Sequence, residues 1–200
     1  MANRLLGTGV TDANGVASMT YTGVGAGKLQ IIAETENISS DEYELIDAIW
    51  YDRATINNHN TWNTQNLGDS LQYTDDYTTF GWNGNSSSGA MILRNVVTDV
   101  SFVNIEMDIK YQINTNENPN VFTLRALGGT LKLYYRMNDL NLNDNEWHHI
   151  KISIRGLTST LEVDGVTIGN KNITDNTWYA IQLQVSVLDA LLSFKNFMVY

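Results

Sequence analysis

Apolar and polar residues alternate along most of this 200-residue chain, and few stretches show the spacing of a helix. Each alternating run places its apolar side chains on one face of a strand. The runs are Leu29–Ala33, Val103–Ile113, Ile150–Ile154, Leu161–Val163 and Tyr179–Val187. The turn dipeptides between such runs are Asn14-Gly15, Gly128-Gly129, Asp164-Gly165 and Gly169-Asn170. The pattern predicts an all-β chain, with residues 49–200 as an antiparallel sandwich or jelly roll and no helix longer than about two turns.

The chain divides near Asp47-Ala48 into a short first part and a longer second part. In residues 1–47 the pattern predicts three strands, at about 15–22, 28–35 and 42–46, where a closed immunoglobulin-like sandwich takes about 100 residues. A T-D-A-N-G-V-A turn and a later A-G turn resemble the second half of bacterial immunoglobulin-like (Ig-like) repeats over residues 8–46. The resemblance implies a partial Ig-like β segment, whose uncovered edges dock on residues 49–200 or on a second copy.

Residues 145–170, NEWHHIKISIRGLTSTLEVDGVTIGN, carry the clearest motifs of the second part. A Trp-His pair opens a long strand and an L-x-V-D-G hairpin follows it, through Trp147, His148, Ile150, Ile152, Leu161, Val163, Asp164 and Gly165. The closing stretch 191–200 fits F-x-N-F-x-V-Y. These features resemble laminin G-like and other concanavalin A-like domains. The resemblance implies that residues 49–200 form a two-sheet jelly roll with Trp147 and Ile152 buried in its core.

Composition narrows the class of partner. The net charge is −10 and only 17% of the residues are charged, which argues against binding to nucleic acid or to an acidic membrane surface. The chain has no cysteine, which excludes disulfides and cysteine-ligated metals. No window approaches the roughly 20 apolar residues of a membrane span, and the first residues lack the apolar core of a secretion signal. We therefore expect a cytosolic protein, a piece of an exported protein, or a component of a particle released by lysis.

Residues 55–88 combine aromatic side chains with many Asn, Ser and Thr residues. Aromatic faces stack on sugar rings, and amides form hydrogen bonds with sugar hydroxyls. Candidate ligand contacts are therefore Trp62, Tyr77, Trp82 and Asn83, together with Tyr135 from a second cluster, Tyr134-Tyr135-Arg136. The alternative is that some of these rings belong to the core, because Tyr and Trp are often largely buried. Of Tyr134 and Tyr135, alternation predicts one in the core and one exposed.

Asp75 and Asp76, with the nearby Asp69, are candidate calcium ligands, because Ca²⁺ takes six to eight oxygen ligands. The alternative is a solvated acidic turn. His148 and His149 point to opposite faces of a strand and cannot readily share one ion. We therefore expect no required cofactor, with Ca²⁺ as the one candidate ion.

Glu106 and Asp108 resemble the start of the E-x-D-x-x-E signature of jelly-roll glycoside hydrolases, in which two carboxylates about 5–5.5 Å apart act as nucleophile and acid/base. Here Tyr111 stands where the last Glu belongs, and on the shorter variant of the signature the position holds Lys110. Neither side chain can act as the carboxylic acid that protonates a leaving oxygen. The sequence therefore predicts that the chain is not an enzyme.

Together these features predict a non-catalytic surface-binding module that recognises a cell-surface glycan or another envelope component. The pairing of an Ig-like piece with a laminin G-like jelly roll looks like phage or archaeal-virus fibre, tail and decoration proteins, or adhesins. We therefore expect it on a virion or an extracellular surface, as a homo-oligomer or as part of a larger particle. Two alternatives remain: a purely structural decoration protein, and a jelly-roll glycoside hydrolase.

Overall fold

The computed structural model describes most of the second part of the chain and two strands of the first. The described residues are 27–31, 43–47, 50–52, 54, 62–67, 70–82, 84, 88–94, 102–113, 117–126, 129–175 and 177–200. The chain divides into two compact units, residues 1–47 and 48–200. In the first unit, β1 (Gly27–Ile31) pairs antiparallel with β2 (Tyr43–Asp47). The strand predicted at 15–22 and the predicted turn at Asn14-Gly15 lie outside the described residues.

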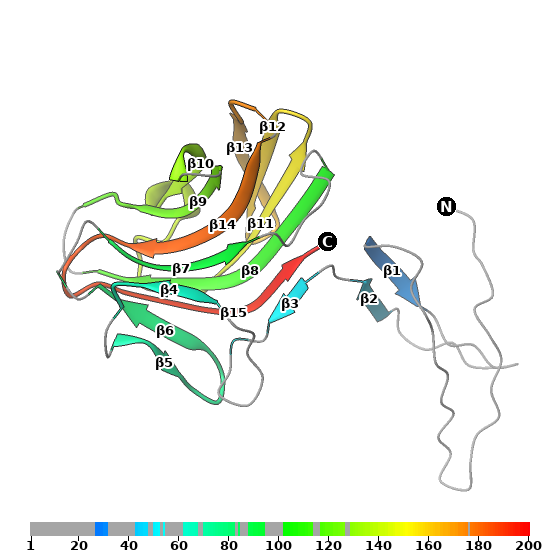
Figure 1. The fold of residues 1–200 in the computed structure, drawn as a ribbon. Helices are drawn as coiled ribbons and strands as arrows, with labels where there is room; N and C mark the ends of the chain where they lie inside the picture. Colours follow the sequence, from blue (N-terminus) through cyan, green and yellow to red (C-terminus); the bar gives the residue numbers. More distant parts are fainter. Residues whose placement is uncertain are drawn as a thin grey trace, which may run out of the picture. The chain divides into compact units, whose positions relative to one another are not determined.

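The second unit consists of two antiparallel sheets (Figure 1). The smaller sheet has the order β10-β9-β14-β7-β4, with β4 (Asn63–Gln65), β7 (Gly89–Arg94), β9 (Asn120–Ala126), β10 (Leu131–Arg136) and β14 (Trp178–Val185). The larger, eight-stranded sheet has the order β13-β12-β11-β8-β15-β6-β5, and β3 also pairs with β15. Its strands are β3 (Trp50–Asp52), β5 (Gln72–Tyr73), β6 (Thr78–Gly81), β8 (Phe102–Gln112), β11 (His148–Arg155), β12 (Thr158–Val163), β13 (Val166–Asn172) and β15 (Leu191–Val199).

This architecture confirms the predicted all-β, two-sheet jelly roll. The helical residues that the structure describes are all of the 3-10 type, at Ser70, at Gly129 and in the turn η3 (Asn138–Leu140). The described part of the chain therefore holds no helix long and apolar enough to cross a membrane.

The core lies between the two sheets and follows the predicted alternation. On β8, every second residue from Val103 to Tyr111 is buried, and on β11 the buried residues are Ile150, Ile152 and Ile154. Residues such as Phe122, Leu124, Ile181 and Leu183 fill the same core from the smaller sheet. Full burial of one such side chain stabilises the fold by about 1.5–3 kcal/mol. The prediction that Ile152 is buried is confirmed.

One predicted turn is confirmed and another is wrong. Asp164 and Gly165 both have positive φ, 52° and 78°, and join β12 to β13, as a two-residue hairpin turn requires. Gly169 and Asn170, in contrast, lie inside β13. The register between β12 and β13 shifts beside Gly169, between Leu161 and Glu162. A glycine inside a strand often marks such a bulge. The Gly169-Asn170 dipeptide therefore belongs to a bulged strand and does not reverse the direction of the chain.

Candidate functional site

The strands β11, β8 and β15 are neighbours in the larger sheet, and their polar positions form one row on its outer face. Glu106 and Asp108 of β8 alternate with core residues. Strand pairing places Lys151 opposite Glu106 and His149 opposite Asp108. On the other side of β8, Lys195 of β15 stands opposite Asp108. Because directly opposed side chains on one face lie about 4.5–5.5 Å apart at Cβ, the fold gathers these charges into one cluster.

Glu106 is buried although it belongs to the outer face, with only 2% of its surface exposed. The Tyr200 hydroxyl donates a hydrogen bond to its Oε1 atom, and the Lys151 ammonium lies 3.2 Å from the same oxygen. On the other side, His149 Nε2 is 3.7 Å from Oε2. A carboxylate this deep is stable only when it is paired and hydrogen-bonded. Glu106 therefore accepts a hydrogen bond from Tyr200 and forms ion pairs with Lys151 and His149.

Asp108 and His149 form the second contact of this cluster, with His149 Nδ1 2.9 Å from Asp108 Oδ1. Partial burial alone would raise the pKa of Asp108, but hydrogen bonds from His149 and Asn196 outweigh it and keep that pKa below its ordinary value. Hydrogen bonds to Asp108 and then to Glu106 raise the pKa of His149 to about 9. His149 therefore carries a positive charge at neutral pH.

A bulge in β15 supplies an amide to this face. The register of β15 against β8 shifts between Lys195 and Met198, and Asn196 has a φ of 51°. Asn tolerates this left-handed conformation better than most residues, and bulges commonly redirect a side chain. The Asn196 Nδ2 group donates a hydrogen bond of 2.8 Å to Asp108 Oδ2.

Two half-buried aromatic rings stand beside the charged row. Trp147 directly precedes β11 and meets Tyr77 edge to face, with ring centroids 5.5 Å apart. The Lys195 ammonium lies 4.9 Å from the Trp147 centroid and 3.1 Å from Asp76 Oδ2. Tyr77 is held in a turn in which Thr74 Oγ1 accepts a 2.9 Å hydrogen bond from its N–H. Aromatic rings, cationic side chains and a side-chain amide thus occur together on this face of the sheet.

The placement of Trp147 corrects the prediction that it is buried in the core. Trp147 is only half-buried. The reason is the alternation of inward and outward positions along this part of the chain. Because Ile150 and Ile152 face the core, Trp147, His149 and Lys151 share the opposite parity and lie on the outer face. The alternation of the isoleucines was the signal in the sequence that could have placed Trp147 correctly.

Two candidate ligand contacts are core residues instead. Trp62 is 5% exposed, and its indole N–H donates a 2.7 Å hydrogen bond to buried Asp52. Its ring packs edge to face against Phe194 and Phe197. Tyr135 is 1% exposed, and its hydroxyl lies 2.7 Å from Ser159 Oγ. Rings this deeply buried, with their polar atoms already hydrogen-bonded inside the protein, are not available to stack on a ligand.

The other candidates from the Asn-rich stretch have different positions. Trp82 is half-buried and packs against the core, so its contact with a ligand stays a prediction. Asn83 lies outside the described residues. In the second cluster, Tyr134 is the exposed ring, at 36%, as alternation requires once Tyr135 faces inward.

The calcium candidates Asp75 and Asp76 lie at the exposed tip of the turn between β5 and β6. Asp76 pairs with Lys195, and Asp69 lies outside the described residues. Within the described ranges, no three His, Asp or Glu side chains come together as metal ligands would. His148 contacts Asp164 and Asp144, whereas His149 contacts Asp108, so the two imidazoles have separate partners.

Comparison with known proteins identifies the fold. The sequence model of the laminin G domain matches residues 86–187, just over half of the chain. No relative was found among curated protein sequences.

Solved structures with a similar fold include a carbohydrate esterase of the Shiga toxin-encoding bacteriophage phi24B, with a TM-score of 0.56 and 11% identity over 76% of this chain and 97% of that one. A sialidase has a TM-score of 0.55 and 9% identity over 70% of this chain, and only 17% of its own length is covered. Alginate lyase AlgAT5 has a TM-score of 0.51 and 11% identity over 68% of this chain and 84% of that one. At such low identity these likenesses concern the fold alone.

Proposed function

The chain belongs to the laminin G domain family, and on that premise we propose that it is a non-catalytic module that binds a glycan on the outer face of its larger sheet. The proposal rests on one observation: the half-buried Trp147–Tyr77 pair stands beside a row of fixed hydrogen-bonding groups. Aromatic rings bind the C–H faces of sugars, and placed polar groups orient the hydroxyls.

The polar groups of this face suit recognition because they are preorganised. Asp108 is held by His149 and Asn196, while Lys195 is held between Asp76 and the Trp147 ring. Groups whose positions are already fixed lose little entropy when a ligand binds. The three similar proteins are, by their names, a carbohydrate esterase, a sialidase and an alginate lyase, which favours a sugar over other ligands of this face.

The same contacts argue against glycoside hydrolysis. A retaining glycosidase needs one carboxylate as nucleophile and a second carboxyl group in its protonated form. Here the pKa of Asp108 is lowered, which does not suit a proton donor. Glu106 accepts a hydrogen bond from Tyr200 and pairs with Lys151, so its Oε1 atom is already occupied. We therefore expect no turnover of β-glucans by the full chain. Turnover that disappears in the Glu106→Gln variant would overturn the non-catalytic part of the proposal.

A glycan array compares the full chain with Trp147→Ala and with a matched control, Tyr179→Ala. Tyr179 is also half-buried, but it packs beside Ala90, Ile92 and Ala180 of the smaller sheet. We expect Trp147→Ala to weaken glycan binding about tenfold, equivalent to about 1.4 kcal/mol, and Tyr179→Ala to leave it unchanged. Equal losses in both variants would contradict the assignment of the face. If no glycan binds the parent chain, the purely structural alternative is favoured.

We further propose that the module works on a virion or another extracellular surface, within a fibre, tail or decoration protein or an adhesin. The likeness in fold to a bacteriophage protein supports a virion. A homo-oligomer would increase the strength of weak glycan contacts through avidity. Flanking genes for virion structural proteins would support the virion, whereas flanking genes for metabolic enzymes would contradict both surface roles. Light scattering on the purified chain measures the oligomeric state.

A further inference from the structure

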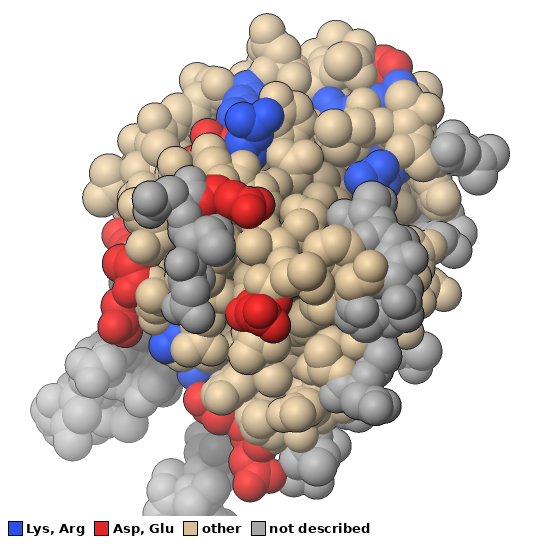
Figure 2. Space-filling view, turned by 90° about the vertical axis from the view of Figure 1, so that its left-hand side faces the viewer, with Lys and Arg blue, Asp and Glu red and all other residues tan. Residues whose placement is uncertain are grey.

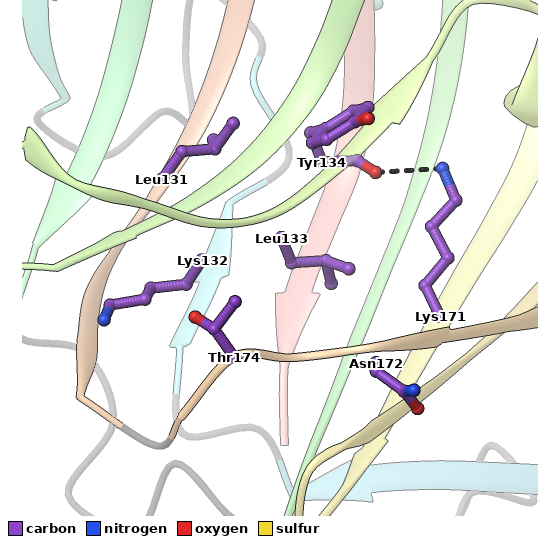
Figure 3. A pocket seen from close by; sticks show the side chains of 7 residues that line it. All are labelled: Leu131, Lys132, Leu133, Tyr134, Lys171, Asn172 and Thr174. Carbon is purple, nitrogen blue, oxygen red and sulfur yellow. Dashed lines mark hydrogen bonds between the residues drawn. The ribbon is translucent and has the colours of Figure 1, made fainter.

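A pocket of about 380 Å³ lies between the outermost strands of the two sheets, away from the Trp147 face. β10 is the last strand of the smaller sheet and β13 is the last strand of the larger one. β10 and the end of β13 supply most of the lining, and Thr174 follows β13. The lining residues are Leu131, Lys132, Leu133, Tyr134, Lys171, Asn172 and Thr174 (Figure 3).

The walls of the pocket combine an apolar surface with a polar rim. Leu131 and Tyr134 are each 36% exposed, and Leu133 is buried beneath them. Asn172 and Thr174 contribute an amide and a hydroxyl from the opposite side. The pocket lies within the size range of small-molecule sites, about 300–1,000 Å³. It therefore offers a sugar ring both an apolar surface and hydroxyl partners.

Two ammonium groups are fixed at this pocket. Lys171 Nζ donates to Asp139 Oδ2 at 2.6 Å and to the Tyr134 carbonyl at 3.1 Å, which ties β13 to β10 (Figure 3). Lys132 Nζ donates to Asp175 at 2.6 Å. An ammonium has three N–H donors, so within the described structure these bonds leave one donor on Lys171 and two on Lys132. The Lys171 Nζ atom also lies 5.0 Å from the Tyr134 ring centroid and 4.7 Å from that of Tyr135. The carboxylate partners hold both cations in position without using all of their donors.

The strands around the pocket are rich in positive charge, although the whole chain carries −10. Arg125, Lys132, Arg136 and Lys171, four of the 12 Lys and Arg residues, lie on β9, β10 and β13. Among the described residues, Lys132 pairs with Asp175 and Lys171 pairs with Asp139. Figure 2 shows Lys and Arg mainly in the upper half of the molecule, at the height of these strands in Figure 1. A local excess of cations of this kind favours an anionic ligand over a neutral one.

We propose that this pocket is a second sugar site, specific for a sugar that carries a carboxylate. The C–H face of the ring packs on Leu131 and Tyr134, and the carboxylate pairs with the Lys171 ammonium, while Lys132 adds positive charge on the other side of the pocket (Figure 3). Asn172 and Thr174 then bond hydroxyl groups. The inference rests on the proposed glycan-binding function, but it concerns a different site and a different charge class of sugar.

Two matched pairs of probes separate charge from ring recognition. Digalacturonate is compared with its neutral dimethyl ester, and 3′-sialyllactose is compared with lactose, by titration calorimetry on the full chain. At least one acidic probe is expected to bind at least about tenfold more tightly than its neutral partner. Amide shifts in NMR spectra should move at residues 131–134 and 171–174. Equal affinity within both pairs, or shifts elsewhere, would overturn the inference.

Substitutions test the role of the cation at the pocket. Lys171→Met keeps the apolar part of the side chain and removes its charge. We expect it to lower the affinity for the acidic probe at least about fivefold, whereas Lys171→Arg keeps the charge and should retain most of the affinity. Lys28→Met, in β1 of the first unit, is the matched control and should bind as the parent does. A loss in Lys171→Met that Lys171→Arg does not restore would indicate a structural role for Lys171 and contradict the proposal.

The two proposals fail in different ways. If neutral glycans bind in a Trp147-dependent manner and no acidic probe binds at the pocket, the inference fails and the proposed function stands. If no glycan of either class binds anywhere on the chain, both fail. Binding of an acidic probe that Lys171→Met weakens and Trp147→Ala leaves intact supports a second, separate site.

Discussion

The outer faces of the two sheets differ in chemistry although both carry polar residues with little exposure. On the larger sheet, Glu106 is ringed by Lys151, His149 and Tyr200. On the smaller sheet, buried Gln182 donates a 2.9 Å hydrogen bond to Gln184, beside the small cluster of Ala90, Ile92 and Ala180.

The difference supports the proposal that the larger sheet carries the recognition face. A buried neutral amide needs only a hydrogen-bond partner, and the Gln182–Gln184 pair supplies one within a single strand. A buried carboxylate costs far more to desolvate and needs cations. On the larger sheet β11 supplies two cations, His149 and Lys151, to Glu106 of β8, and two aromatic rings stand beside this row. Such a costly arrangement is more common at functional sites than in a purely structural surface.

The largest contrast should appear when each face loses one polar group. Glu106→Gln leaves Lys151 and His149 without their buried carboxylate, and we expect a loss of about 3 kcal/mol in the free energy of unfolding. Gln184→Leu removes one neutral hydrogen bond and should cost about 1 kcal/mol. Urea denaturation of both variants measures the difference. Equal costs would mean that the charged cluster is not a stabilising unit.

The sequence was sufficient for the fold because alternation records which residues face the core. Val103 to Tyr111 and Ile150 to Ile154 have the predicted orientation, and the Asp164-Gly165 hairpin is where it was predicted. The register between strands is not written in any one strand. The pairing of His149 with Asp108 depends on how β8 and β11 align. Because these two residues lie 41 positions apart in the sequence, the pattern within each strand could not predict their contact.

The candidate ligand residues were harder to predict, because an aromatic residue in an Asn-rich segment can face either way. Trp62 turns inward since Asp52 accepts its indole N–H inside the core. Tyr77 remains on the outer face, next to Trp147, as a candidate contact. Asn196 was not singled out, because the bulge that redirects it arises from the pairing of β15 with β8.

The pH dependence of stability gives a second, smaller contrast. The pKa of His149 is about 9 in the folded chain and about 6.5 when unfolded. The folded state therefore holds this proton more tightly, and the resulting stability is fully present below about pH 6.5 and is lost as the pH rises through about 9. Urea denaturation at a series of pH values should show this decline. Because His149 is half-exposed, solvent screening keeps the effect small.

His149→Gln should remove most of this slope, and His148 provides the comparison. Burial alone would lower the pKa of His148, but hydrogen bonds to Asp164 and Asp144 raise it, so it contributes a slope of the same sign. The stability of the double variant His148→Gln/His149→Gln should therefore depend less on pH than that of either single variant. An unchanged slope in His149→Gln would show that its contacts with Asp108 and Glu106 do not form in solution.

The smallest effect is expected at the acidic turn, where the ion pair and the calcium hypothesis make opposite predictions. Asp76 is 70% exposed at its side chain and pairs with Lys195, so Asp76→Ala should cost no more than about 0.5 kcal/mol, as exposed pairs do. A calcium site with a Kd near 1 mM would instead stabilise the chain by about 1.4 kcal/mol at roughly 10 mM Ca²⁺. We expect melting curves in Ca²⁺ and in EDTA to coincide. A calcium-dependent rise in Tm that Asp75→Ala and Asp76→Ala both abolish would instead make this turn a metal site and leave Lys195 as a secondary partner of Asp76.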